Sequence, residues 1–201
     1  MANNNYDASL TAQHISTNLA SYESARSGFF TFIVDDLDGI LKSTYKGDPA
    51  AATDEDKLLH AQEYLKLNVT KASAPHFSLG VLEYRRGNEV VRFAGVPDWP
   101  QGNSITVDDV VGLDTKAILM AWQALAYNVH TRKGGRMKDY KKTCTLCEYT
   151  QDYELVRSWT LYGCWISEIG ESEFDKTSDG KREMTATVIF DRAEMNLPDA
   201  N

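Results

Sequence analysis

The sequence predicts a mainly β protein, a β-sandwich or barrel-like domain with one flanking α-helix and long loops. Residues 139–168 contain two β-prone runs joined by a short polar connection, which is the pattern of two paired strands. Residues 114–129, directly before them, carry apolar side chains at helical spacing. Another β-prone run follows at residues 183–193. Together these segments indicate a broad β-surface with a helix beside it.

The composition fits one domain. The chain has 201 residues, of which 42% are hydrophobic, and this is enough to bury one substantial core. The formal net charge of -8 argues against an ordinary nucleic-acid-binding protein, which carries a basic face. The first residues show no secretory signal pattern, and no apolar run approaches the roughly 20 residues of a membrane span. We therefore expect a soluble product that is made in the cytoplasm.

The N-terminal region combines a polar arm with one apolar strand. Residues 1–27 are rich in Ala, Ser, Asn and Thr, and they predict either a short helix or an arm that becomes ordered only against a neighbour. Residues 28–36 are apolar on both faces, which predicts a strand covered on two sides. We expect the β-domain to span residues 28–193, with residues 194–201 as a C-terminal tail.

A long polar stretch, residues 36–56, follows this strand. A loop of about twenty residues is uncommon in a compact domain, and it usually either has a function or is disordered. Its few apolar side chains are predicted to pack on an adjacent subunit, whereas a mobile, solvated loop is the alternative. The candidate contact residues in this stretch are Ile40, Leu41, Tyr45, Asp54, Glu55 and Asp56.

Three extended segments precede the helix. Residues 63–71 alternate between apolar and polar side chains, which predicts a strand with one solvated face. Residues 78–95 predict a hairpin with its turn at residues 86–88, where Gly and Asn tolerate positive φ. Residues 104–112 predict a further short strand. All three agree with the mainly β class.

The helix at residues 114–129 has one continuous apolar stripe. Ile118, Trp122, Leu125 and Val129 recur at helical spacing, and this is the face expected to pack on the sheet. Asp114 is a suitable N-cap. Trp122 is interpreted as a core residue, although its ring could instead serve as a ligand platform.

A basic segment follows the helix, with six Lys or Arg residues between positions 132 and 142. It does not fit the spacing of a phosphate-binding P-loop. In a chain this acidic, we predict that it meets the acidic loops of another copy and fixes the register between subunits. A solvated loop is the alternative. The candidate contact residues here are Arg132, Lys133, Arg136 and Lys138.

The three cysteines are interpreted as buried or half-buried thiols. Cys144 and Cys147 form a C-x-x-C pair within an apparent strand, where residues three apart point to opposite faces and are roughly 10 Å apart. That separation exceeds the reach of a disulfide. Cys164 is expected opposite the beginning of the same strand, away from both. A structural zinc site would need a fourth ligand and a compact loop.

The sequence contains no catalytic motif. The four histidines are isolated, and no G-x-S-x-G, G-x-G-x-x-G or S-x-x-K pattern occurs. The acidic residues within 35–38 lack the remaining ligands of a calcium loop. We therefore predict that the protein is not an enzyme and uses no cofactor and no metal. A small metal-binding domain that uses Cys144, Cys147 and His130 is the less favoured alternative.

The order of these elements resembles the tail-tube proteins of tailed bacteriophages, in particular those of contractile-tailed phages. The resemblance is densest between residues 77 and 193, whereas the N-terminal arm and residues 36–56 match less well. Its most specific features are Lys141-Lys142 at a strand start, Trp159 and Leu161 in the next strand, Gly163-Cys164-Trp165 at its end, and Asp191-Arg192.

The resemblance implies a phage tail-tube fold, in which six copies form a ring whose strands join into a continuous inner β-barrel. Stacked rings would form a hollow tube of the virion, through which the genome passes into the host. Expected partners are further copies of the chain, the tail sheath, the baseplate and tape-measure proteins, and DNA that passes without specific binding. The acidic balance would keep DNA from adhering to the wall. A tube of the bacterial type VI kind, which carries effectors, is the alternative.

Overall fold

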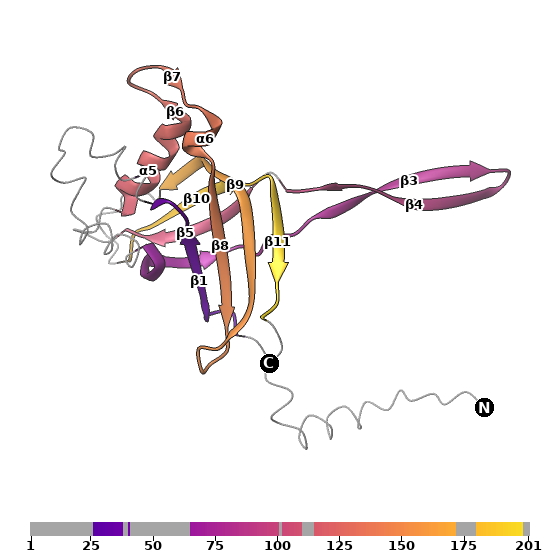
Figure 1. The fold of residues 1–201 in the computed structure, drawn as a ribbon, viewed down its shortest axis with the longest axis horizontal. Coiled ribbons are helices and arrows are strands. Elements are labelled where there is room, and N and C mark those ends of the chain that lie inside the picture. The colour runs from indigo at the N-terminus through magenta and orange to yellow at the C-terminus, as the bar shows by residue number, and fades with distance from the viewer. Residues whose placement is uncertain are drawn as a thin grey trace.

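The computed structural model describes residues 26–37, 40, 65–100, 102–109, 115–171 and 180–198. Within these ranges, strands predominate and form two packed sheets, with helix α5 (Thr115–Ala126) beside them (Figure 1). The mainly β class and the flanking helix that the sequence predicts are therefore confirmed.

The first layer, sheet A, contains the paired strands predicted at residues 139–168. Strands β8 (Lys142–Tyr149) and β9 (Leu155–Glu171) are antiparallel neighbours. The Thr150 hydroxyl caps their connection by accepting hydrogen bonds from the backbone N–H groups of Asp152 and Glu154. Strand β1 (Phe30–Val34) pairs with β8, and β11 (Arg192–Asn196) pairs with β9. Sheet A thus has the order β1-β8-β9-β11, in which all neighbours are antiparallel.

The second layer, sheet B, begins with the same long strand. β9 pairs with β8 and β11 as far as Cys164, and from Trp165 onward it pairs with β10 (Glu183–Ile189). Strands β5 (Asn103–Asp108) and β2 (Val69–Ala72) complete the layer. Because β9 belongs to both layers, all seven strands are hydrogen-bonded into one sheet: six follow the path β1-β8-β9-β10-β5-β2, and β11 is attached to β9 beside this path.

The core lies between the two layers. Every second side chain of β5 and β10 is buried and the others face outward, as expected for a sheet with one covered face. Sheet A contributes a matching set of inward side chains through its register. Buried core residues from the two sheets include Phe32, Val34, Leu146, Leu161, Ile105, Val107, Ile166, Met184, Ala186 and Val188.

Helix α5 closes the core through Trp122. This side chain is only 1% exposed, and its indole Nε1 donates a hydrogen bond to the Tyr140 carbonyl at 2.9 Å. The interpretation of Trp122 as a core residue is therefore confirmed. The helix ends at Ala126, three residues earlier than predicted, and Val129 is exposed. The chain turns there because β6 (Tyr127–Asn128) pairs back onto β7 (Lys133–Gly134). The short helix α6 (Met137–Tyr140) then leads into β8.

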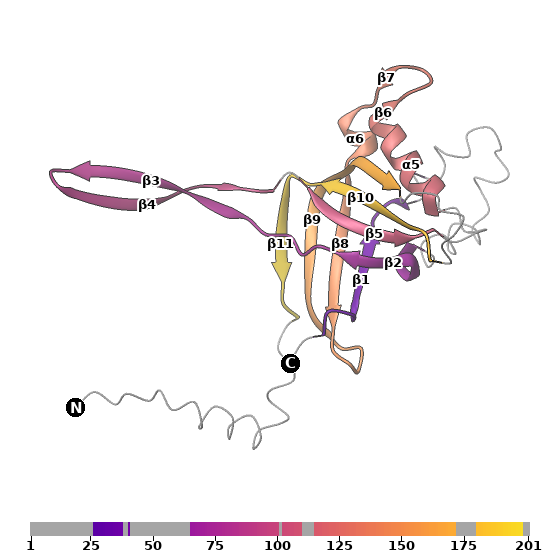
Figure 2. The ribbon, with the colours of Figure 1, turned by 180° about the vertical axis from the view of Figure 1, so that it is seen from behind.

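The predicted hairpin is confirmed and extends far from the body of the protein (Figures 1 and 2). It consists of β3 (Ser78–Arg86) and β4 (Glu89–Asp98). Gly87 in the turn has φ of 66°, which a glycine adopts without steric cost. β3 follows β2 and β4 precedes β5 in the chain, so the hairpin grows out of sheet B.

Two sequence predictions of strands are wrong. Residues 65–68, within the strand predicted at 63–71, are helical, and only Val69–Ala72 forms a strand. Leu65 and Asn68 are both buried, and their separation of three residues is typical of a helix. Leu65 and Val69 are also both buried, and their even spacing is compatible with a strand, so the sequence satisfies both patterns. The single strand predicted at 183–193 is two strands, because the chain leaves sheet B after Ile189 and enters sheet A at Arg192.

The long polar stretch predicted at residues 36–56 is only partly described. Within it, Leu37 and Ile40 are helical and fully buried in the core, so this part is not a polar loop. Leu41, Tyr45, Asp54, Glu55 and Asp56 lie outside the described residues, as does most of the predicted N-terminal arm.

Three residues from separate family-like motifs meet where β9 passes from one sheet to the other. Gly163 has φ of 71°, and the carboxylate of Asp191 lies directly against its backbone. Asp191 in turn accepts hydrogen bonds from the Lys141 ammonium at 2.7 and 2.8 Å. Residues 22 to 50 positions apart in the chain therefore form one corner.

We expect Gly163→Ala to destabilise the subunit by about 1–3 kcal/mol, because a side chain at positive φ is strained. The added Cβ would also lie 2.2 Å from the Asp191 carboxylate oxygen, which would force this carboxylate away from Lys141. Chemical denaturation of the purified variant measures the loss. Gly134→Ala is the matched control, since a Cβ there meets nothing within 4 Å. Equal stability of the two variants would contradict the assigned role of the corner.

Candidate assembly surface

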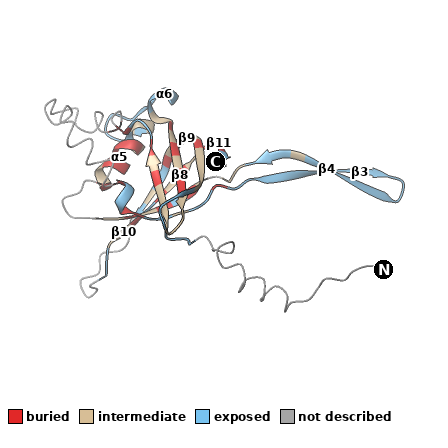
Figure 3. Cartoon of the chain, turned by 60° about the horizontal axis from the view of Figure 1, so that its bottom comes forward, coloured by how far each residue is buried: buried red, intermediate tan, exposed pale blue. Residues whose placement is uncertain are grey.

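One face of the β3–β4 hairpin is made of large apolar side chains. The register pairs Leu82 with Phe93 and Tyr84 with Val91, so these four residues share one face, here called the hairpin apolar face. Their exposed fractions are 62%, 57%, 61% and 45% respectively. Figure 3 shows the hairpin as almost entirely exposed, unlike the strands of the two sheets.

The opposite face of the hairpin is more polar. Glu83 and Arg92 pair across the two strands, with 2.9 Å between the Arg92 Nε and a Glu83 carboxylate oxygen. Arg85 lies on the same face, next to this ion pair. The exposed Val81 and Val90 also lie on this face, so the two faces differ in degree: the larger apolar side chains are on the hairpin apolar face and the ion pair is on the opposite one.

The hairpin apolar face requires a cover for physical reasons. A two-stranded ribbon is marginally stable by itself in water, and contiguous exposed apolar residues usually mark an interaction site. None of the four side chains belongs to the core cluster of the described residues. The single subunit thus presents an extended element whose apolar surface is left for another molecule to bury.

The predicted basic contact residues lie together at another part of the molecule. Arg132, Lys133, Arg136 and Lys138 are all exposed, on the β6–β7 turn and the adjoining start of α6; we call them the basic loop. The remaining two cations of this segment face the body instead. Lys141 pairs with Asp191, and the largely buried Lys142 pairs with Asp36.

Of the contact residues predicted within residues 36–56, Ile40 alone lies in the part of the chain that the structure describes. Asp54, Glu55, Asp56, Leu41 and Tyr45 fall outside the described residues. Ile40 has no exposed surface and packs in the core of its own subunit, so it is left out of the surfaces that follow. The structure therefore brings together the four basic candidates, but it does not place the acidic ones beside them.

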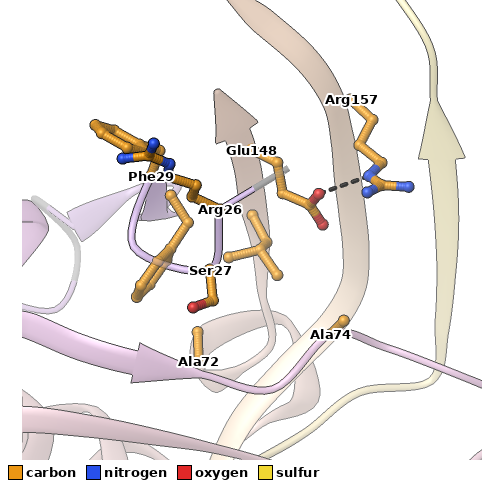
Figure 4. Close-up of a pocket in the computed structure, with 9 residues that line it drawn as sticks. Arg26, Ser27, Phe29, Ala72, Ala74, Glu148 and Arg157 are labelled. Atoms are coloured by element: carbon orange, nitrogen blue, oxygen red, sulfur yellow. Dashed lines mark hydrogen bonds and ion pairs between the residues drawn. The ribbon is translucent and has the colours of Figure 1, made fainter. Parts of the chain in front are cut away.

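A pocket of about 290 Å³ opens between the ends of the two sheets (Figure 4). Phe29, Phe30, Ala72 and Leu146 contribute apolar lining, and Glu148 and Arg157 form an ion pair of 2.6 Å across β8 and β9. Each charge of this pair is compensated by the other. The pocket is thus an apolar recess beside the beginning of β1, without a nucleophile placed against a base.

The cysteines are buried thiols, as predicted. Cys144 and Cys164 are 0% exposed, and all three cysteines are free. Burial raises the pKa of the Cys144 thiol well above its usual value, and the neighbouring Cys164 and Asp35 raise it further. A thiol that stays protonated is a poor nucleophile and a poor metal ligand.

One detail of the cysteine prediction is wrong. The Cys164 backbone lies opposite Lys142 at the start of β8, as expected, but its side chain is close to that of Cys144, and its Sγ donates a hydrogen bond to the Leu161 carbonyl at 3.4 Å. The register shifts between Lys142 and Cys144, and such an irregularity changes which side chains share a face. Among the described residues, no group of three or more His, Cys, Asp or Glu residues could hold a metal ion. None of the described helices has the length and hydropathy of a membrane span.

The hairpin apolar face was missed at the level of the sequence, although a signal for it exists. Leu82 and Tyr84 alternate with charged residues in β3, and Val91 and Phe93 flank Arg92 in β4. Once the two-residue turn fixes the register, the four apolar side chains must share one face. The alternation in each strand was visible, but it predicts a half-buried strand and does not show that the body of the subunit leaves this face uncovered.

Comparisons with solved structures show a shared fold. One chain in the sheath–tube complex of an extracellular contractile injection system, PVC, in its extended state is 16% identical, with 91% of this chain and 98% of that chain covered and a TM-score of 0.58. A chain in the tube-terminating cap of the anti-feeding prophage is 15% identical, with 88% and 93% covered and a TM-score of 0.59. A chain in the baseplate of the same particle is 12% identical, with 89% and 99% covered and a TM-score of 0.55.

Comparison with protein families identifies the chain itself. No curated protein sequence matches it. The family model described as "T4-like virus tail tube protein gp19" matches residues 60–189, which is well over half of the 201 residues. This range contains the hairpin, both sheets except β1 and β11, and helix α5. The protein therefore belongs to the T4-like virus tail tube protein family.

Proposed function

We propose that this chain assembles into hexameric rings that stack into the hollow inner tube of a phage tail, through which the genome passes into the host. The observation that carries the proposal is the hairpin apolar face, because its four side chains project from the body and stay uncovered in a single subunit. We infer that the role of the chain is structural and that no single copy carries out chemistry, and its membership of a tail tube family supports this.

The occupant of the hairpin apolar face is a second copy of the same chain. The hairpin projects from one side of the body (Figures 1 and 2), and we infer that its acceptor is a different surface of the neighbouring copy. A contact between two different surfaces of identical subunits is heterologous, and it generates closed rings or open stacks. A long tube needs a contact of this kind, since a self-complementary contact would stop at a dimer.

The free edges of the sheets support the same arrangement. In the described strands, β1 and β11 are the edges of sheet A, whereas β2 and the second part of β9 are the edges of sheet B. Unpaired edges invite pairing with another chain. Joining the edges of neighbouring copies would close a barrel and leave no edge open.

The proposed partners follow from the same family. We infer that the tube interacts with a tail sheath, a baseplate and a tape-measure protein, and that DNA passes along it without specific binding. The similar folds in a sheath–tube complex, a tube-terminating cap and a baseplate support the first two. The product would be a component of the virion, made in the host cytoplasm.

Electron microscopy of the purified full chain tests the proposal directly. Negative-stain images and sedimentation velocity are expected to show hexameric rings or hollow tubes at high protein concentration. A protein that stays strictly monomeric at high concentration, and also in the presence of its baseplate complex, would contradict the proposal.

The basic loop is proposed to contact acidic residues of an adjacent ring, and this gives a second prediction. Reversing the charge at Arg132 and Arg136 together is expected to reduce tube yield several-fold at low salt, because an attractive contact becomes repulsive. The yield from the unaltered chain should fall with rising salt, since the screening length shortens to about 3 Å at 1 M. Arg85→Asp, a charge reversal outside the basic loop, is the control. If the tube yield changed neither with the salt concentration nor on reversal of the charges at Arg132 and Arg136, this contact would be excluded.

A tube that carries effectors in place of a genome is the second candidate. The fold similarity to chains of an extracellular contractile injection system supports it. The nucleic-acid content of particles isolated from the producing cells distinguishes the two, because only a phage tail is attached to a DNA-filled capsid.

A further inference from the structure

The outward face of sheet B carries a continuous set of hydroxyl side chains. Thr185 lies directly opposite Thr106, and Thr187 lies opposite Ser104. Ser73 extends the set beyond β2, since its hydroxyl lies 3.1 Å from that of Ser104. We call Ser73, Ser104, Thr106, Thr185 and Thr187 the hydroxyl face.

The charges that border the hydroxyl face nearly cancel. On β2, Lys71 lies directly opposite Thr106 and pairs with Glu183 at 3.4 Å, and Lys181 pairs with Asp108 at 3.3 Å. Among the described residues, Glu168 lies opposite Thr187 and adds a third carboxylate to this border. These two lysines and three carboxylates of the described residues leave a formal charge of -1, although the whole chain has a net charge of -8.

The direction of the strands indicates which sheet closes around the channel. The β3–β4 hairpin continues the direction of the strands of sheet B, whereas the strands of sheet A run across it (Figures 1 and 2). If the hairpin reaches the next ring, it lies along the tube, and so do the strands of sheet B. Strands along a barrel axis form their hydrogen bonds around the circumference, so sheet B is the layer that neighbouring copies can join into a closed wall.

We propose that the hydroxyl face lines the channel, and that the channel wall is therefore polar and almost uncharged. This inference rests on the proposed function. Hydroxyl groups exchange hydrogen bonds with water at little cost, and a wall without a dominant charge neither attracts nor strongly repels a polyanion. A DNA duplex would then slide past through water-mediated contacts. This differs from the expectation, drawn from the net charge of the chain, that the wall repels DNA.

Thiol labelling of assembled tubes tests the location of the hydroxyl face. Thr185→Cys places a thiol on it, and Ser158→Cys places one on the outward face of sheet A, opposite Cys147 and Asn196. Each variant is co-assembled with an excess of the unaltered chain, whose own thiols are buried. A maleimide on a polymer too large to enter the tube should label Ser158→Cys in tubes and Thr185→Cys only in unassembled subunits.

The charge of the wall is measured at the same position with two small thiol reagents, one cationic and one anionic. The ratio of their rates at Thr185→Cys is expected to change less than about threefold between subunits and tubes. An acidic wall would concentrate the cation and raise this ratio by about tenfold or more. Thr187→Cys provides a second position on the same face, with the same expected results.

The outcomes separate this inference from the function on which it rests. If the unaltered chain forms no tubes, the proposed function fails. If tubes form and the large reagent labels Thr185→Cys in them as readily as in subunits, the hydroxyl face lies outside and the inference fails alone. A tenfold change in the rate ratio would also overturn it, because the wall would then be charged.

Discussion

Phe93→Asp is expected to prevent tube formation while leaving the subunit folded. Phe93 lies in the middle of the hairpin apolar face and is 57% exposed, so the substitution removes nothing from the core. Burial of a carboxylate in an apolar contact is unfavourable, and loss of a central contact residue typically costs about 2 kcal/mol or more. That corresponds to about a 30-fold increase in the concentration needed for each contact, and the contact recurs in every subunit.

The measurement is the critical concentration for assembly, taken from sedimentation of tubes, together with circular dichroism of the variant. Arg85→Asp is the matched control, because it introduces the same side chain on the opposite face of the same hairpin. We expect Arg85→Asp to change the critical concentration only a few-fold. Normal tubes from Phe93→Asp would show that the hairpin apolar face is not the contact.

The second large effect is expected at the core. Trp122→Ala should lower the free energy of unfolding by about 3–5 kcal/mol, as for other large aromatic side chains that are truncated in a core. The change leaves a cavity under α5 and removes the hydrogen bond that joins this helix to the Tyr140 carbonyl. Urea denaturation measures the loss. Trp122→Ala should be measured in a chain that also carries Phe93→Asp, because assembly into tubes would otherwise add to the apparent free energy of unfolding.

Two controls define how Trp122 acts. Trp122→Phe keeps most of the apolar volume but loses the Nε1 donor, so it should cost clearly less than the alanine variant and still leave the Tyr140 carbonyl without this donor. Met120→Ala alters an exposed residue of the same helix and should stay within about 0.5 kcal/mol of the unaltered chain. A loss below about 1 kcal/mol for Trp122→Ala would mean that α5 is not required to close the core.

The elements that the sequence predicted well are those in which one periodicity dominates. Trp122 recurs with other apolar residues at helical spacing, and it is buried as that pattern requires. β8, β9 and the hairpin follow the alternation of a strand over many residues, with recognisable turns between them. In these segments the local pattern and the tertiary fold agree, and the prediction was correct to within a few residues.

The errors fall where a short segment satisfies two patterns or where the chain changes layers. Leu65 and Asn68 are buried on a helical turn, but the same few residues also alternate as a strand does. The break between β10 and β11 depends on the corner that Asp191 forms with Lys141 and Gly163. These residues are distant in sequence, so no local pattern could place them together.

The candidate contact surface was harder to predict than the fold. The positive charge of the basic loop is the only feature of the sequence that predicts it as a contact, and the structure places its four residues on one exposed loop. To predict the hairpin apolar face, one would have to know that no described element of the subunit packs on Leu82, Tyr84, Val91 and Phe93. Such a property follows from the arrangement of the whole subunit and is not encoded in any short stretch.

The passage of β9 through both sheets has a mechanical consequence. Layers held together only by side-chain packing can shear past one another when a force acts on one of them. Here a single covalent backbone of 17 residues runs from one layer into the other, so traction applied to either layer is transmitted along the chain. A subunit built in this way would deform as a single unit under an axial load.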